Sequence, residues 1–90
     1  MGVIFDEAKR QQNLLKHGLD LADADQVFKG PKFTLEDDRR DYSEPRFRTY
    51  GLLGGRLVFV AWTLREDDFR VIMMRKCNER EQEAFTARLG

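Results

Sequence analysis

Hydrophobic and polar residues alternate most clearly on the two sides of Gly54-Gly55. Two alternating runs joined by two glycines predict a β-hairpin with a two-residue turn. The strands would then cover residues 44–53 and 56–65, with Leu53 opposite Arg56. Because the turn fixes the pairing of the strands, it also fixes the face of the sheet on which each side chain lies.

Side chains alternate between the two faces of a strand, so this register separates two groups of residues. One face, here called the polar platform, receives Glu44, Arg46, Arg48, Tyr50, Thr63 and Arg65. The opposite face receives Phe47, Val58, Val60, Trp62 and Leu64, which we expect to lie in the core. A merely solvated face does not require three clustered arginines, so we interpret the platform as a site for phosphate groups.

The first part of the chain predicts a short strand and two helices. An apolar strand over residues 3–5 precedes Asp6, a residue typical of a helix N-cap. The first helix should run over residues 7–17 and end at Gly18. A second, shorter helix should cover residues 21–28.

After Gly30-Pro31, the pattern predicts mainly strands. A strand over residues 33–36 leads into a charged loop that extends through Asp41, and a buried strand covers residues 69–74 after the hairpin. The last helix should span residues 79–89. This order indicates one α+β domain over all 90 residues, with an antiparallel sheet, two N-terminal helices and one C-terminal helix.

Composition narrows the function classes. Lys and Arg together number 16, as do Asp and Glu, so the net charge is zero. General affinity for nucleic acid is therefore not expected. A local basic patch is still compatible with this composition, because the acidic residues can lie elsewhere on the surface. A single cysteine and a single histidine exclude an internal disulfide and a multi-histidine metal site, so no metal or other cofactor is expected. The chain has no apolar run of membrane-spanning length and no signal-peptide pattern, which favours the cytoplasm.

The first predicted helix also carries a polar stripe. Its members at helical spacing are Lys9, Asn13, Lys16 and His17, while Leu14 and Leu15 would turn toward the core. His17 titrates near neutral pH, and the helix dipole at its position favours the protonated form. If the stripe borders the polar platform, the two form one basic groove.

Structural interpretations compete with the functional ones. A histidine just before a helix-ending glycine is often a capping residue, and a Lys/Asn stripe is often a solvated helix face. Glu44 opposite Arg65 would also serve as a simple cross-strand pair worth about 0.2–1 kcal/mol. The face occupied by Arg75 depends on a turn at Asp67-Asp68 and is left open.

Short motifs along most of the chain resemble those of the BrnT toxin family. They are Phe5-Asp6, Lys9, Asn13, Lys16-His17-Gly18-Leu19, Ala22 through Val27-Phe28, Glu44-x-Arg46, Gly51, Thr63-x-Arg65, Arg70-Val71-Ile72-x-x-Arg75-Lys76 and Glu79-Arg80. The resemblance implies a RelE-like ribonuclease toxin that cleaves RNA without metal and is neutralised by a cognate DNA-binding antitoxin, expected to be a ribbon-helix-helix protein. DNA would then be contacted only through the antitoxin complex, and no membrane partner is implied.

Metal-free RNA cleavage requires a group that accepts the 2′-hydroxyl proton and cations that offset charge on the phosphate. The catalytic candidates are His17, Glu44, Arg46, Arg65 and Arg75, and the candidate RNA contacts are Lys9, Asn13, Lys16, Arg48, Tyr50, Thr63 and Arg70. Two other classes stay open: a non-catalytic module whose arginine-rich face docks an acidic protein or RNA, and a ParE-like toxin that acts on a protein.

Overall fold

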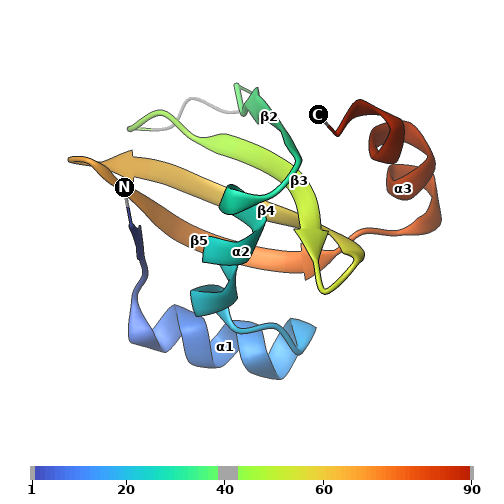
Figure 1. Cartoon of the computed structure of the whole chain (residues 1–90). Coiled ribbons are helices and arrows are strands. Elements are labelled where there is room, and N and C mark those ends of the chain that lie inside the picture. Colours follow the sequence, from blue (N-terminus) through green and yellow to red (C-terminus); the bar gives the residue numbers. More distant parts are fainter. Residues whose placement is uncertain (1, 39–42, 90) are drawn as a thin grey trace.

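A five-stranded sheet in the order β1-β5-β4-β3-β2 forms the centre of the computed structural model, which describes residues 2–38 and 43–89 (Figure 1). Three α-helices and two 3-10 turns accompany the sheet. In chain order the elements are β1 (Val3–Ile4), α1 (Glu7–His17), the 3-10 turn η1 (Leu21–Asp23), α2 (Ala24–Lys29), β2 (Lys32–Glu36), β3 (Phe47–Leu53), β4 (Arg56–Arg65), β5 (Asp68–Lys76), α3 (Glu79–Phe85) and the 3-10 turn η2 (Thr86–Arg88).

The sheet is mixed, which corrects the expectation of an antiparallel sheet. β1 pairs in parallel with β5, with Val3 opposite Phe69 and Ile4 opposite Arg70, whereas the other neighbours are antiparallel. The Phe69 amide donates to the Gly2 carbonyl at 2.8 Å and extends this pairing. A two-residue strand carries no sequence signal for its direction, so the pattern alone did not reveal the parallel edge.

The central hairpin has the predicted register. Leu53 lies opposite Arg56, and the pairing continues to Phe47 opposite Trp62. Gly54 and Gly55 both have positive φ, 57° and 79°, as a two-residue turn matched to the twist of the strands requires. β3 begins at Phe47, so residues 44–46 precede the strand instead of opening it.

One extra residue interrupts the ladder between β4 and β5. Ala61 pairs with Met73, but the next residue, Trp62, pairs with Val71, which leaves Ile72 as a bulge. On the C-terminal side of this bulge Arg75 pairs with Phe59. Arg75 therefore shares the face that carries the polar platform, the point that the sequence left open.

The other face of the sheet supports the main core. Leu21, Ala24, Val27 and Phe28 from η1 and α2 pack against Val58, Val60, Trp62, Val71 and Met74. Leu64 does not belong to this core, because it lies close to the end of β4 and remains 49% exposed. Its predicted burial is thus wrong, whereas the prediction for Trp62 is confirmed.

Helix boundaries follow the predicted caps closely at α1. The Asp6 side chain accepts from the Ala8 amide at 2.8 Å, and Gly18 ends the helix with φ of 70°. The second helix differs from its prediction, because a 3-10 turn replaces its first part and α2 covers only Ala24–Lys29. The last helix has the capping box of Asn78 and Glu81, but η2 replaces its final turn. The predicted charged loop includes residues 39–42, which lie outside the described residues.

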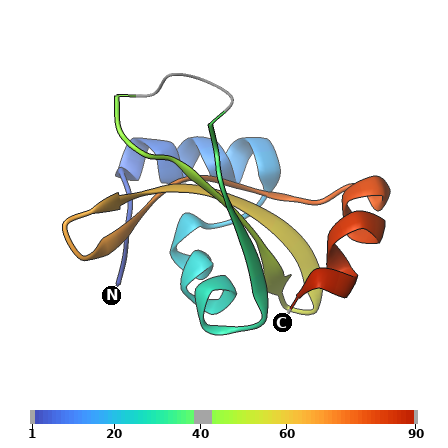
Figure 2. The same cartoon turned by 90° about the horizontal axis from the view of Figure 1, so that it is seen from above.

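Helix α1 lies along β5 and is joined to it by the side chain of Asn13 (Figures 1 and 2). The Asn13 amide donates to the Met74 carbonyl at 2.9 Å, and its oxygen accepts from the Met74 amide at 3.1 Å. A second donation reaches the Leu19 carbonyl at 2.9 Å. Asn13 therefore occupies the position of a neighbouring strand at the edge of β5 beyond β1.

This narrow contact explains why the predicted burial of Leu15 is wrong. Leu15 is 90% exposed, while Asn13 is the only α1 residue that is fully buried. Two positions along a helix correspond to a rotation of about 200° at 3.6 residues per turn. A side chain two residues from Asn13 consequently points away from the sheet.

Helix α3 lies apart from α1 in both views and packs on the platform face near the hairpin (Figures 1 and 2). The Phe85 ring stacks on Tyr50 with 4.0 Å between the centroids and on Phe33 with 5.9 Å. The Arg88 guanidinium lies 4.1 Å from the centroid of Phe33. Through these few contacts α3 forms one wall of the hollow described next.

Candidate functional site

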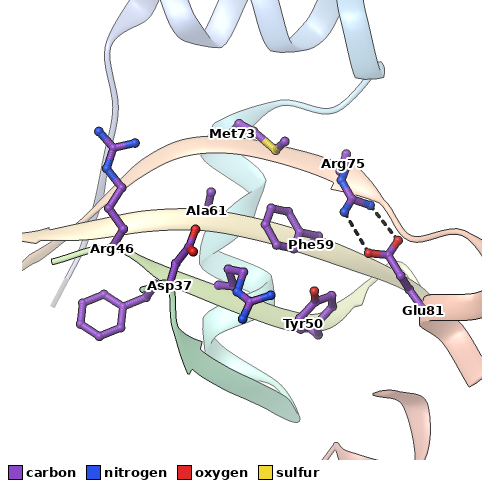
Figure 3. A pocket seen from close by; sticks show the side chains of 10 residues that line it. Asp37, Arg46, Tyr50, Phe59, Ala61, Met73, Arg75 and Glu81 are labelled. Carbon is purple, nitrogen blue, oxygen red and sulfur yellow. Dashed lines mark hydrogen bonds and ion pairs between the residues drawn. The ribbon is translucent and has the colours of Figure 1, made fainter. Parts of the chain in front are cut away.

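A hollow of about 490 Å³ opens on the platform face of the sheet. Figure 3 shows this main hollow, with α2 behind the sheet and the labelled side chains on the near side. Its apolar lining comes from Phe47, Tyr50, Phe59, Ala61 and Met73, and its charged lining comes from Asp37, Arg46, Arg48, Arg75 and Glu81. The hollow thus combines a largely apolar floor with three guanidinium groups and two carboxyl groups.

Two of the three arginines reach the hollow from β3 and from the residue just before it. Arg48 lies in β3 opposite Ala61, and Arg46 lies just before the same strand. The carbonyl of Arg46 accepts from the Asp37 amide at 2.7 Å, which joins the end of β2 to the approach of β3. The Nε atom of Arg48 is buried and makes no hydrogen bond within residues 2–38 and 43–89. Burying a guanidinium donor without a partner is costly, so a bound acceptor at Arg48 would be favoured.

Arg75 is held by a carboxylate and by an aromatic ring. Its Nη1 and Nη2 atoms donate to the two carboxylate oxygens of Glu81 at 2.8 and 2.9 Å. The guanidinium also lies 4.6 Å from the centroid of the Phe59 ring, within cation–π distance. The hydrogen bonds between them raise the pKa of Arg75 and lower the pKa of Glu81, so both groups stay charged.

Tyr50 contributes a hydroxyl group from a buried ring. The residue is only 4% exposed, yet it lines the main hollow, and Figure 3 draws its hydroxyl on the side of the hollow. Burial is the main cause that raises the pKa of Tyr50, so the phenol remains protonated at neutral pH. Tyr50 can therefore donate a hydrogen bond to an anion in the hollow.

A second, smaller hollow of about 210 Å³ lies between α1 and β5. It is lined by Lys9, Gln12, Asn13, Lys16, His17, Ile72 and Met73. Met73 lines both hollows, so the polar stripe of α1 borders the sheet site and the two hollows adjoin.

His17 has an environment that corrects the expectation of a favoured protonated form. Burial lowers the pKa of His17 below its ordinary value of 6.5, and the positive charges of Lys16 and Arg75 lower it further. A neutral imidazole at neutral pH is able to accept a proton.

Four of the predicted site residues lie outside both hollows. Glu44 and Arg65 form an ion pair with each other at 3.8 Å. Thr63 is 1% exposed and donates to the Pro45 carbonyl, so its hydroxyl is already engaged inside the fold. Arg70 lies opposite Thr63 in the ladder and lines neither hollow.

Asn13 lines the second hollow, but its amide is already used by the backbone of Met74 and Leu19. Its exposed fraction is 6%, and its hydrogen bonds join α1 to β5. The remaining predicted residues meet in the two hollows. Arg46, Arg48, Tyr50 and Arg75 line the main one, and Lys9, Lys16 and His17 line the second.

Two acidic residues of the main hollow, Asp37 and Glu81, were not among the predicted site residues. Glu81 is part of the capping box of α3, and a capping role by itself gives no sign of the bond to Arg75 six positions earlier. Asp37 is 8% exposed and had no signal beyond its place in an acidic cluster. Met73, which the pattern placed in the core, is half-buried and joins the two hollows.

Residues 2–38 and 43–89 contain no cluster of three or more histidine, cysteine or acidic side chains that could hold a metal ion. Within the same ranges, every helix is too short or too polar to span a bilayer.

Comparison with known proteins assigns the family. The family model described as "Ribonuclease toxin, BrnT, of type II toxin-antitoxin system" matches residues 5–81. No curated protein matches the chain. The matched range contains every residue that lines either hollow, from Lys9 to Glu81. The chain therefore belongs to the BrnT family of ribonuclease toxins of type II toxin–antitoxin systems.

Proposed function

We propose that this toxin is a metal-independent endoribonuclease and that an RNA strand crosses β5 at Met73, between the two hollows. The family supplies the ribonuclease class. The observation that carries the location is the convergence of Arg46, Arg48 and Arg75 over one apolar floor. A hollow of about 490 Å³ also lies within the range of small-ligand sites.

In this proposal the main hollow holds the scissile phosphate. The guanidinium group of arginine presents paired donors that match two phosphate oxygens. Charge that develops on the pentacoordinate phosphate would be offset by Arg48 and Arg75, with Arg46 beside them. The Tyr50 phenol, which stays protonated, would donate a further hydrogen bond to the same phosphate.

The second hollow supplies the proton acceptor. The neutral imidazole of His17 would take the proton of the 2′-hydroxyl, whose oxygen then attacks the adjacent phosphorus. The bond to the 5′-oxygen breaks and this oxygen takes a proton from water, so the products carry a 2′,3′-cyclic phosphate and a 5′-hydroxyl. Lys9 and Lys16 would bind the backbone of the neighbouring nucleotide. Glu44 and Arg65, which pair with each other, have no step in this scheme.

The toxin–antitoxin family implies a cognate antitoxin partner, which supports neutralisation by that partner as part of this proposal. We propose that the partner is a cytoplasmic ribbon-helix-helix protein and that DNA is contacted only through the complex. Since this toxin has no net charge, the local arginine cluster is the natural target of an acidic antitoxin segment. Covering the main hollow would block RNA directly and prevent the growth arrest that free toxin causes.

The test is RNA cleavage by the purified toxin in excess EDTA, with variants of the main hollow. Arg48→Ala and Arg75→Ala should each lower kcat/KM by about 10²-fold or more, the scale found for loss of one stabilising donor. Arg80→Ala, an exposed arginine on α3 that lines neither hollow, serves as the matched control and should change the rate less than about twofold.

Four results would contradict the proposal, each in a different way. Full activity of both hollow variants would place the active site elsewhere. Activity that disappears in EDTA and returns with Mg²⁺ would contradict metal independence. RNA that binds without being cut would favour the non-catalytic module, and cleavage-free toxicity would favour a protein target.

A further inference from the structure

Helix α3 places a carboxylate on one edge of Arg75. The two oxygens of Glu81 accept from Nη1 and Nη2 at 2.8 and 2.9 Å, which is a bidentate end-on pair (Figure 3). The side chain of Glu81 is only 17% exposed and that of Arg75 is 30% exposed. Partial burial and two short hydrogen bonds hold the guanidinium in one orientation.

Glu81 is itself fixed by the start of α3. Its Oε1 atom accepts from the Asn78 amide at 3.0 Å, while its own amide donates to the Asn78 side chain at 2.8 Å. The helix start thus orients the carboxylate independently of Arg75. On the other side, the ring of Phe59 supports the guanidinium at 4.6 Å.

The end-on pair leaves a second edge of Arg75 unused. Nη1 makes one further, long contact of 3.4 Å with the Lys76 carbonyl. Nε and the remaining hydrogen of Nη2 make no hydrogen bond in the described part of the chain. A guanidinium can donate from its Nε–Nη edge as a second parallel fork, which matches two oxygens of a phosphate.

We propose that Glu81 is a positioning residue of the ribonuclease site: it holds Arg75 by one edge so that the Nε–Nη2 edge faces the scissile phosphate. This inference rests on the proposed function, in which Arg75 binds that phosphate. It assigns to the C-terminal helix a part in catalysis through Arg75, without contact between Glu81 and RNA.

A proton-transfer role for Glu81 fits the contacts less well. Both of its oxygens are engaged, and the hydrogen bonds from Arg75 are the first cause that lowers the pKa of this carboxyl. A carboxylate stabilised in this way is a weak base. Holding Arg75 is the chemistry that its geometry favours.

The experiment is a double-mutant cycle measured as RNA cleavage rates. Glu81→Gln keeps the shape and one acceptor for the Asn78 amide, but its NH₂ group cannot accept from Arg75. We expect kcat and kcat/KM to fall together by about 10- to 100-fold, because a small misplacement of a stabilising group has effects on this scale. In the Arg75→Ala background, Glu81→Gln should lower the rate no further.

Arg75→Lys provides a second arm that leaves α3 intact. Lysine keeps the charge but lacks the planar fork, so its rate should fall like that of Glu81→Gln, and combining the two changes should add little. Glu83→Gln, the same substitution at an exposed position of α3, is the matched control. Melting curves by circular dichroism accompany every variant so that rates are compared for folded protein.

The outcomes separate this inference from the proposed function. A slow Arg75→Ala variant with a fully active Glu81→Gln variant would overturn the role of Glu81 alone. Equal losses from Glu81→Gln with and without Arg75 would overturn it as well, since additivity means that Glu81 acts by another route. Full activity of Arg75→Ala would overturn both this inference and the assignment of Arg75 to the active site.

Discussion

The bridge from Asn13 to the edge of β5 gives the sharpest prediction for the stability of this fold. Replacing Asn13 with Ala removes two hydrogen bonds to Met74 and one to Leu19. The two with Met74 are buried, and the Met74 side chain itself belongs to the main core. The substitution therefore leaves backbone groups without partners at a place where the fold has little room to rearrange.

The size of the effect follows from those orphaned groups. A buried backbone donor or acceptor that loses its partner costs about 1–3 kcal/mol. The amide and carbonyl of Met74 are both affected, and water that enters the second hollow beside Asn13 would reduce the cost toward the lower end. We expect the free energy of unfolding to fall by about 3 kcal/mol, which corresponds to about 12–24 °C in Tm for a domain of this size.

The assay is urea unfolding followed by fluorescence. Trp62 is the only tryptophan and is 8% exposed, so its emission reports the integrity of the core. The midpoint should shift with an unchanged m value, as expected when stability alone changes. Gln12→Ala is the matched control, because Gln12 lines the same hollow and is exposed. Its effect should be within about 0.5 kcal/mol.

A loss of less than about 1 kcal/mol for Asn13→Ala would refute the reasoning, because it would fall below the cost of even one buried unpaired group. Such a result would mean that α1 is held on β5 by other contacts and that Asn13 does not replace a strand at this edge.

Three further predictions concern single positions. Gly51→Ala should cost about 1–3 kcal/mol in urea unfolding, because its Cβ would lie 2.7 Å from Val27 Cγ1, whereas Gly30→Ala, with ordinary contact at 3.6 Å, should cost less. Cys77 is 1% exposed and burial raises the pKa of its thiol to about 11, so a thiol reagent at about pH 8 should modify it only after unfolding; rapid modification of folded protein would contradict its burial. Because the pKa of His17 is lowered, the unfolded chain takes up its proton first as the pH falls through about 6.5, and this residue's contribution to stability should be lost progressively from that pH down to the lower pKa of the folded state. The decline of the cleavage rate toward acid pH should occur below pH 6.5 and should be absent in the His17→Asn variant. A His17 pKa above 6.5, measured by NMR titration, would contradict both expectations.

The hairpin was predictable because one local feature determined it. Two glycines between alternating runs allow a single register, and that register places Arg48 and Tyr50 on one face without any tertiary information. Helix caps such as Asp6 and Gly18 were predictable for the same reason, since each cap acts within a few residues.

Other features depended on contacts between distant segments. The parallel pairing of Val3 with Phe69 joins residues that no local pattern connects, and the bulge at Ile72 lies inside an uninterrupted apolar run. The bond between Glu81 and Arg75 was hidden because the same carboxylate also satisfied a helix cap. The use of Asn13 as a strand substitute was likewise invisible, because a polar residue on a helix stripe usually faces water.

The bulge at Ile72 also determines which changes of chain length the site tolerates. Removing Ile72 would leave Met73 and Val71 opposite the same partners on β4, so Arg75 would keep its face of the sheet. Once the bulge is gone, a second one-residue deletion between Val71 and Arg75 would turn the guanidinium toward the helical core, because a slip of one residue reverses the face of each side chain that follows. When BrnT sequences of different lengths are aligned through this strand, a one-residue gap therefore belongs at position 72, where the ladder can absorb it.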